Sequence, residues 1–221
     1  MKRLDRILLD NVMPSVFVGD EDECARPSQV WRTRLELERG QYYCVNASSG
    51  AGKTSFCSFI YGVRTDYQGR IAFDGADIRP FRPSEWSRLR CSNLAYLPQE
   101  LDLFDELSAL DNVLLKNRLT DFRSEADIRR MFGMLGIDNR ISAPAGRMSV
   151  GQKQRVAFIR ALCQPFDFLI LDEPVSHLDA YNNGLVGQLA VEAARELGAG
   201  IIFTSVGNVL ELPSPYIPLT L

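Results

Sequence analysis

The sequence predicts an α/β fold in which a largely parallel core sheet is interrupted by an inserted helical segment. Short apolar runs rich in β-forming residues alternate with longer helical patterns, as in strands that are joined by helices. Residues 168–171, Phe-Leu-Ile-Leu, are an unbroken apolar run of the kind found in strands buried on both faces. Residues 107–162 are mostly helical in pattern, with breaks near Gly136 and at residues 143–146.

The first third of the chain is expected to form strands around a turn at Pro14 and a surface loop at residues 19–28. The loop is predicted because its residues are first acidic and then include a proline. The strand candidates are rich in residues with high β propensity or alternate between polar and apolar residues. They are residues 7–9, 16–18, 31–37 and 41–45.

The rest of the chain continues the alternation. Helices are predicted over residues 53–60 and 181–197. Further strands are predicted at residues 70–73, 94–97, 168–171 and 200–204. We expect one domain over residues 1–221, with an α/β core at about 1–98 and 164–221 and a helical subdomain at about 99–163.

Composition excludes several classes of protein. With 46% hydrophobic and 24% charged residues the chain is typical of globular proteins, and a net charge of −3 predicts no nucleic-acid partner. No stretch approaches the roughly 18 consecutive apolar residues that cross a bilayer, and residues 7–9 are too short for a secretory signal. The 5 cysteines are scattered without a CxxC pair, which favours a reducing cytosol. Any membrane role is therefore expected to come through a partner.

The strongest local signal is a glycine-rich turn that follows a predicted strand and opens a predicted helix. In this context Gly50 and Gly52 let successive backbone N–H groups point at phosphate oxygens. Lys53 is expected to bridge the β- and γ-phosphates, and the Thr54 hydroxyl to face Mg²⁺. Ala47 replaces the usual first glycine, which we expect to be tolerated unless that residue needs a positive φ. The predicted phosphate-binding residues are Ser48, Ser49, Gly50, Ala51, Gly52, Lys53, Thr54 and Ser55.

Two carboxylates follow the apolar run at residues 168–171. A carboxylate at the tip of a core strand can hold Mg²⁺ through water, and the next can orient or deprotonate an attacking water. An apolar strand that ends in two acids is a weak signal alone, but the phosphate-binding turn strengthens it. Asp172 is predicted to act on the metal and Glu173 on the water.

Residues 148–157, Met-Ser-Val-Gly-Gln-Lys-Gln-Arg-Val-Ala, narrow the class further. They resemble the signature motif of ATP-binding cassette (ABC) proteins, commonly Leu-Ser-Gly-Gly-Gln followed by a basic helix. Ser149, Gly151 and Gln152 match, whereas Met148 and Val150 depart from the motif. Ser149 is also predicted to cap a helix N-terminus. The resemblance implies that Ser149, Gly151 and Gln152 contact ATP held by a second cassette, so that ATP joins a dimer.

Other motifs follow in the order that the resemblance implies. Gln99 is similar to the family's glutamine loop, which contacts Mg²⁺ or the attacking water, and residues 103–113 continue the likeness. Residues 176–179, Ser-His-Leu-Asp, resemble the loop that crosses the dimer interface. The implied fold is a P-loop NTPase with a RecA-like core sheet, an antiparallel β subdomain and an inserted helical subdomain. Residues 73–78 and 86–90 look similar to cassettes of the lipoprotein-release and macrolide-export type.

Two positions depart from the family or leave alternatives. The family usually has a histidine that touches the γ-phosphate where this chain has Ser205, which predicts slow hydrolysis. The single histidine, His177, is expected to be exposed or interfacial. In the family, an aromatic residue from the early strands usually stacks on adenine. Phe17 is the candidate, with Trp31 and the tyrosine pair at residues 42–43 as rivals that are better explained as core or strand residues.

Three functions are compatible with some or all of these motifs. The leading hypothesis is the ATPase subunit of an ABC transporter, which binds MgATP between two cassettes, identical or different, and drives separate transmembrane permease subunits. It would be cytoplasmic and peripheral on the cytoplasmic face of the membrane. The alternative is a cassette that gates a membrane or cell-division assembly without pumping, with slow or no hydrolysis. A P-loop small-molecule kinase explains Lys53 and Asp172 but gives residues 148–160 no role.

Overall fold

The computed structural model describes residues 2–19 and 27–221. Its centre is a five-stranded parallel sheet in the order β6-β7-β8-β3-β9, so strands distant in sequence lie side by side. The predicted largely parallel core sheet is therefore present. The strands are β3 (Tyr42–Asn46), β6 (Leu94–Leu97), β7 (Phe168–Leu171), β8 (Gly200–Ser205) and β9 (Ile217–Thr220).

A second sheet is four-stranded and antiparallel, in the order β2-β1-β4-β5. Its strands are β1 (Arg6–Pro14), β2 (Arg34–Glu38), β4 (Tyr67–Phe73) and β5 (Ala76–Asp77). The predicted strand at residues 16–18 is wrong, because the chain turns after Pro14 into the 3-10 helix η1 (Ser15–Phe17). There the Val18 N–H donates back to the Ser15 carbonyl instead of to a neighbouring strand.

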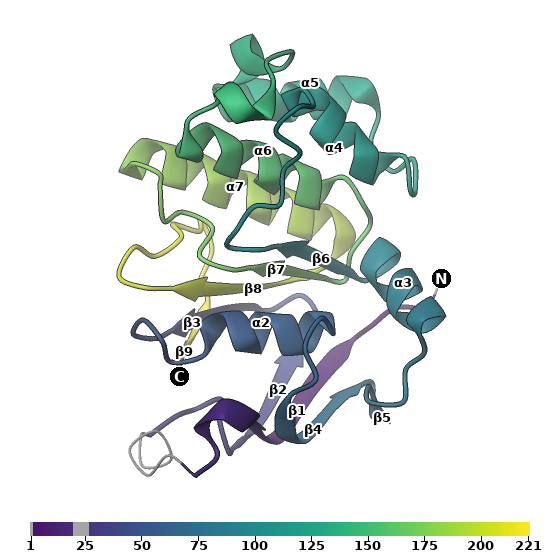
Figure 1. Ribbon diagram of the computed structural model, residues 1–221, viewed down its shortest axis with the longest axis vertical. Helices are drawn as coiled ribbons and strands as arrows, with labels where there is room; N and C mark the ends of the chain where they lie inside the picture. Colours follow the sequence, from purple (N-terminus) through teal and green to yellow (C-terminus); the bar gives the residue numbers. More distant parts are fainter. Residues whose placement is uncertain (1, 20–26) are drawn as a thin grey trace.

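Helices cover both faces of the parallel sheet (Figure 1). Below it in this view lies α2, and α6 and α7 lie above it, with α4 and α5 stacked further out and α3 beside β6. Of these helices, α4, α5 and α6 fall within residues 99–163, where the sequence predicts the inserted helical subdomain. The bounds are α2 (Lys53–Tyr61), α3 (Pro83–Ser92), α4 (Ala109–Asn117), α5 (Glu125–Met134), α6 (Val150–Leu162) and α7 (Ala180–Leu197), with short 3-10 turns η2 (Asp138–Arg140) and η3 (Ala145–Arg147).

The parallel sheet divides the core into two clusters, because side chains alternate between its faces. Along β7, Leu169 and Leu171 belong to the cluster under α6 and α7, whereas Phe168 and Ile170 belong to the cluster around α2 and the antiparallel sheet. All four are fully buried. Burial on both faces explains why every residue of β7 is apolar.

Among residues 2–19 and 27–221, no helix is long and apolar enough to cross a membrane. The cysteines of the described residues, at positions 44, 57, 91 and 163, are free thiols. Cys24 lies outside the described residues.

Candidate nucleotide-binding site

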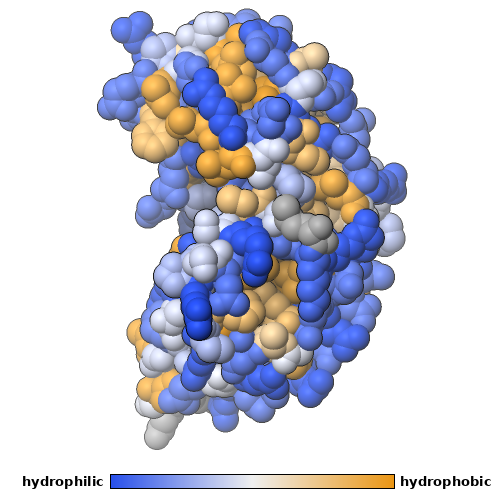
Figure 2. All heavy atoms as spheres, turned by 90° about the vertical axis from the view of Figure 1, so that its right-hand side faces the viewer, coloured by the Kyte–Doolittle hydropathy of each residue, from blue (hydrophilic) through white to orange (hydrophobic). Residues whose placement is uncertain are grey.

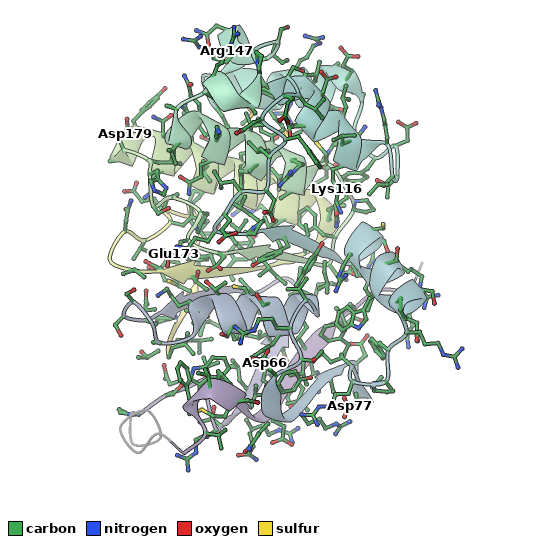
Figure 3. The ribbon with its side chains drawn as sticks, viewed as in Figure 1. Asp66, Asp77, Lys116, Arg147, Glu173 and Asp179 are labelled. Carbon is green, nitrogen blue, oxygen red and sulfur yellow. The ribbon has the colours of Figure 1, made fainter. Side chains whose placement is uncertain are left out.

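The polar motifs meet at one edge of the parallel sheet. Register pairs Asn46 with Ser205 and Leu171 with Phe203, so the carboxyl ends of β3, β7 and β8 lie together. The loop from β3 to α2 is at the left edge of Figure 1, and Glu173 lies toward the same side in Figure 3. Binding sites of open parallel sheets form outside the carboxyl ends of the strands. The topology therefore places the predicted phosphate turn beside the predicted acidic pair.

The phosphate turn has the backbone that its glycines predict. Gly50 and Gly52 adopt φ values of 82° and 94°, in the left-handed region that favours glycine. Ala47 lies outside that region, which agrees with the expectation that alanine is tolerated there. A Cβ at Gly52 would approach the Phe17 and Trp31 rings to 3.0 and 3.2 Å, so both rings pack on the turn.

Lys53 begins α2 and is 5% exposed. Its Nζ donates to the Ser48 carbonyl at 2.9 Å and lies 3.6 Å from Glu173 Oε1. The Lys53 ammonium group therefore lies between the phosphate turn and the Glu173 carboxylate. A phosphate that entered the turn would offer this buried cation a stronger acceptor than a peptide carbonyl.

Oxygen donors suited to a small cation converge beside Lys53. The exposed Thr54 hydroxyl donates to Gln99 Oε1 at 3.3 Å, which joins two of the predicted metal-facing residues. Asp172 is 1% exposed, and its Oδ1 accepts from the Thr204 hydroxyl at 2.7 Å. Its Oδ2 is buried without a hydrogen-bond partner among the described residues. An orphaned carboxylate oxygen near hydroxyl and amide oxygens fits Mg²⁺, a hard cation that prefers oxygen ligands and keeps several waters.

The other predicted phosphate-binding residues differ in their exposure. The Ser55 hydroxyl accepts from Arg64 Nη1 at 2.8 Å and is 8% exposed, so its side chain points away from the turn. Ser48, Ser49 and Gly50 are exposed, which leaves the turn open to a ligand. Ala51 is buried beneath it.

Trp31 has a direct role that the sequence did not indicate. It is 7% exposed as a core residue, as predicted, but its indole Nε1 donates to the Ala51 carbonyl at 3.2 Å. It thus holds the phosphate turn from below while its ring edges approach Phe56 and Phe59 of α2. Trp31 lies 21 residues before Gly52 and belongs to no motif, so its role is seen only in the folded structure.

The signature segment forms the start of α6. The Ser149 hydroxyl accepts from the Gln152 N–H at 3.3 Å, and Gln152 Oε1 accepts from the Ser149 N–H at 3.0 Å. This capping box confirms the predicted N-cap and leaves Ser149 and Val150 exposed. Gly151 packs on the following loop, since a Cβ there would lie 2.9 Å from the His177 carbonyl oxygen. His177 itself is exposed, as expected.

The structure brings together Lys53, Thr54, Gln99, Asp172 and Glu173. It places Ser149 and Gln152 elsewhere: within the described residues, no hydrogen bond or ion pair joins the start of α6 to the phosphate turn.

Ser205 ends β8 at the same edge and is 1% exposed. Its hydroxyl donates to the Asn208 carbonyl at 3.0 Å, and its carbonyl accepts from the Ala47 N–H at 3.3 Å. The side chain therefore closes its own turn instead of projecting into the open site. Thr204, one residue earlier, is the group that contacts Asp172, and it belongs to none of the predicted motifs.

A glycine-lysine turn between strand and helix, an acidic end on a neighbouring parallel strand and an outward-facing capped helix define a P-loop ATPase of the cassette type. A family model described as ABC transporter matches residues 31–176. The chain belongs to the ABC transporter family, and it carries the ATP-binding cassette of that family's ATPases. The prediction of the family and of its ATP ligand is confirmed.

Curated relatives agree with this assignment. The molybdate/tungstate import ATP-binding protein WtpC of Archaeoglobus fulgidus is 33% identical over 78% of this chain and 70% of that protein. The lipoprotein-releasing system ATP-binding protein LolD of Shewanella denitrificans is 26% identical over 89% of this chain and 84% of that protein. The match to WtpC of Pyrococcus abyssi spans only 41% of that protein's length. The expected likeness to the lipoprotein-release type is confirmed by the LolD matches.

Solved structures confirm the fold class. A dimeric structure of MJ0796, described as a bacterial ABC transporter cassette, aligns with a TM-score of 0.78 over 97% of this chain and 94% of that chain, at 22% identity. A dimeric post-hydrolysis state of the same cassette bound to ADP and Pi aligns with a TM-score of 0.74 at 20% identity.

Proposed function

We propose that this chain binds MgATP between two cassettes and hydrolyses it to drive separate transmembrane permease subunits. The observation that carries the proposal is the separation of two complementary half-sites in one chain. Lys53 and the acidic strand end form one half, and the exposed, capped start of α6 forms the other. An exposed helix N-terminus favours anions, so a second copy can close the phosphate site of the first.

Roles follow for the residues at the strand end. Asp172, Thr54 and Gln99 would hold Mg²⁺, which would neutralise phosphate charge when bound. Glu173, with a side chain that is 16% exposed, would orient the attacking water. Phe17, whose ring packs on Gly52, would stack on adenine.

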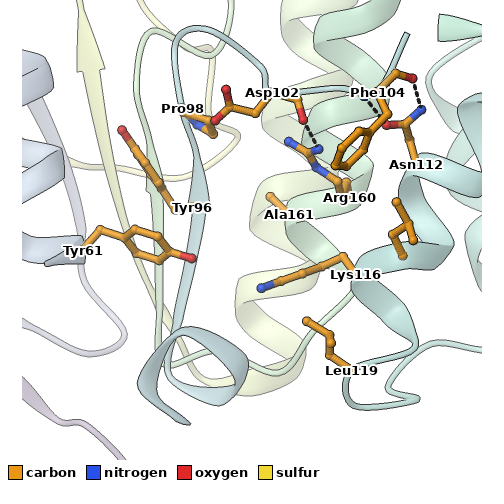
Figure 4. Close-up of a pocket in the computed structure, with 11 residues that line it drawn as sticks. Tyr61, Tyr96, Pro98, Asp102, Phe104, Asn112, Lys116, Leu119, Arg160 and Ala161 are labelled. Atoms are coloured by element: carbon orange, nitrogen blue, oxygen red, sulfur yellow. Dashed lines mark hydrogen bonds between the residues drawn. The ribbon is translucent and has the colours of Figure 1, made fainter. Parts of the chain in front are cut away.

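A groove on another face supports a membrane partner. It encloses about 300 Å³ between the end of α2, β6, α4 and α6, and Tyr61, Tyr96, Lys116 and Arg160 line it (Figure 4). Burial lowers the pKa of Lys116, whose side chain extends into the groove in Figure 4.

Three exposed apolar side chains line the same groove: Phe104, Leu115 and Leu119, at 57%, 41% and 62% exposure. Figure 2 shows apolar surface gathered over the upper part of this face. Exposed apolar patches rimmed by charge mark interaction sites. We assign the groove to a cytoplasmic segment of the permease that presents apolar side chains and a carboxylate, which would hold the cassette on the cytoplasmic face of the membrane.

The Glu173→Gln variant tests the nucleotide proposal. It should bind MgATP, fail to hydrolyse it and accumulate as an ATP-bound dimer, which light scattering after size exclusion would detect. Lys53→Ala is the matched control and should stay monomeric, because it loses the phosphate-binding ammonium group. A Glu173→Gln variant that remained monomeric under saturating MgATP would contradict the composite site.

The alternative, a cassette that gates an assembly with slow or no hydrolysis, is favoured by Ser205, whose hydroxyl is engaged by Asn208. Ser205→His should raise the hydrolysis rate about tenfold or more if this position limits the reaction. An unchanged rate would show that another group contacts the γ-phosphate.

A further inference from the structure

A buried glutamine in the second turn of α6 joins the signature helix to the acidic strand end. Gln154 is 3% exposed. Its Nε2 donates to the Glu173 backbone carbonyl at 3.1 Å and to the Ser176 hydroxyl at 3.3 Å. Its Oε1 accepts from the His177 N–H at 3.3 Å. One side-chain amide therefore holds both ends of the segment from residue 173 to residue 177.

The Gln154 amide contacts the backbone of Glu173, whose conformation is unfavourable. Glu173 adopts a φ of 49°, a left-handed conformation that costs a residue with a Cβ about 1–2 kcal/mol. On its other side, the Glu173 N–H donates to the Thr204 hydroxyl at 3.0 Å. Both peptide groups of Glu173 are thus fixed, one by Thr204 on β8 and one by Gln154 on α6. The direction of the Glu173 carboxylate depends on this pair of contacts.

We infer that Gln154 is a positioning residue for Glu173, acting through the Glu173 backbone and not on the nucleotide. The inference rests on the proposed function, in which Glu173 orients the attacking water. The start of α6 is the half-site that meets ATP of the second copy, and Gln154 lies within the same helix. The amide therefore links the engagement of one ATP to the geometry of the carboxylate that acts on the other.

A second buried glutamine provides a matched control. Gln164 follows α6, is 1% exposed, and donates from Nε2 to the Leu94 carbonyl at 2.9 Å, at the start of β6. Gln154→Met and Gln164→Met each remove one buried amide of similar shape. Gln154→Met should lower the melting temperature, and Gln164→Met should lower it less, because Gln164 Oε1 has no hydrogen-bond partner among the described residues.

Only Gln154→Met should reduce kcat, by about 10- to 100-fold, since a small misplacement of a reacting group costs that much. Its affinity for ATP, and its ATP-driven dimerisation in the Glu173→Gln background, should match those of the parent. This split separates a positioning role from a structural one.

The outcomes distinguish this inference from the function on which it rests. A kcat for Gln154→Met within about twofold of the Gln164→Met value would overturn it. Loss of ATP affinity or dimerisation would also overturn it, because Gln154 would then assemble the binding site. If Gln154→Met does not fold, Gln154→Glu keeps the acceptor for His177 and removes the donor to Glu173, and it should show the same loss of kcat. The proposed function itself would be refuted if the parent protein showed no ATP hydrolysis that is lost in Glu173→Gln.

Discussion

Gly151 provides a quantitative test of how the signature turn is packed. A Cβ added there would lie 2.9 Å from the His177 carbonyl oxygen, whereas ordinary contact begins near 3.4 Å. Gly151→Ala must therefore push the loop or tilt the start of α6 by about 0.5 Å, and overpacking of this kind costs about 1–3 kcal/mol. The same change adds up to about 1 kcal/mol of helix propensity, which opposes the steric cost.

Gly133 in α5 isolates the steric part of the effect, because a Cβ there would meet nothing within 4 Å. Gly133→Ala should gain helix propensity without a clash. In nucleotide-free thermal unfolding, Gly151→Ala should melt below Gly133→Ala by about 2–12 °C, at 2–4 °C per kcal/mol for a chain of this size. Equal melting temperatures for the two variants would refute the contact between α6 and the His177 loop.

Three further predictions concern single contacts. Trp31→Phe keeps a ring but loses the donor to Ala51, so titration should show ATP affinity about 2- to 10-fold weaker; unchanged affinity would contradict the role. Gly187→Ala would place a Cβ 1.9 Å from the Glu211 carbonyl and should lower the melting temperature, whereas Gly184→Ala, with its nearest contact at 3.9 Å, should not. Burial raises the pKa of three thiols, those of Cys44 (to about 11), Cys57 and Cys163 (to about 12), which therefore stay protonated at pH 8. Peptide mapping of the native protein should show slow alkylation at these three cysteines, and fast labelling would contradict their burial.

The elements predicted most accurately from the sequence are those in which burial on both faces makes the whole segment apolar. Strands β6 and β7 were predicted at their observed bounds, because strands buried on both faces must be apolar throughout. The α3 helix was not assigned, since its residues are mostly polar and Ser92 is its single buried residue. Strand β9 was not assigned either, because Pro218 disfavours a strand and its place beside β3 is set by tertiary pairing.

The residues of the candidate site also fall into two groups, those that a linear motif predicts and those that only the fold brings into contact. The phosphate turn and the acidic pair are linear motifs, so their residues could be predicted from spacing and neighbouring elements. Thr204 and Gln154 could not be predicted, because each acts on the backbone or carboxylate of a residue that is distant in sequence. Their roles exist only once β7, β8 and α6 pack together.

The segment after β8 shows how the departure at residue 205 is accommodated. Ser205 donates to the Asn208 carbonyl, and Asn208 Nδ2 donates to the Val175 carbonyl at 2.9 Å, next to the loop that packs on Gly151. A γ-phosphate contact from residue 205 would have to break the first of these bonds, because a serine hydroxyl has one proton to donate. The Ser205 hydroxyl therefore cannot donate to Asn208 and to the phosphate at once. Because the Ser205 hydroxyl is engaged in this way, we predict that this chain hydrolyses ATP slowly.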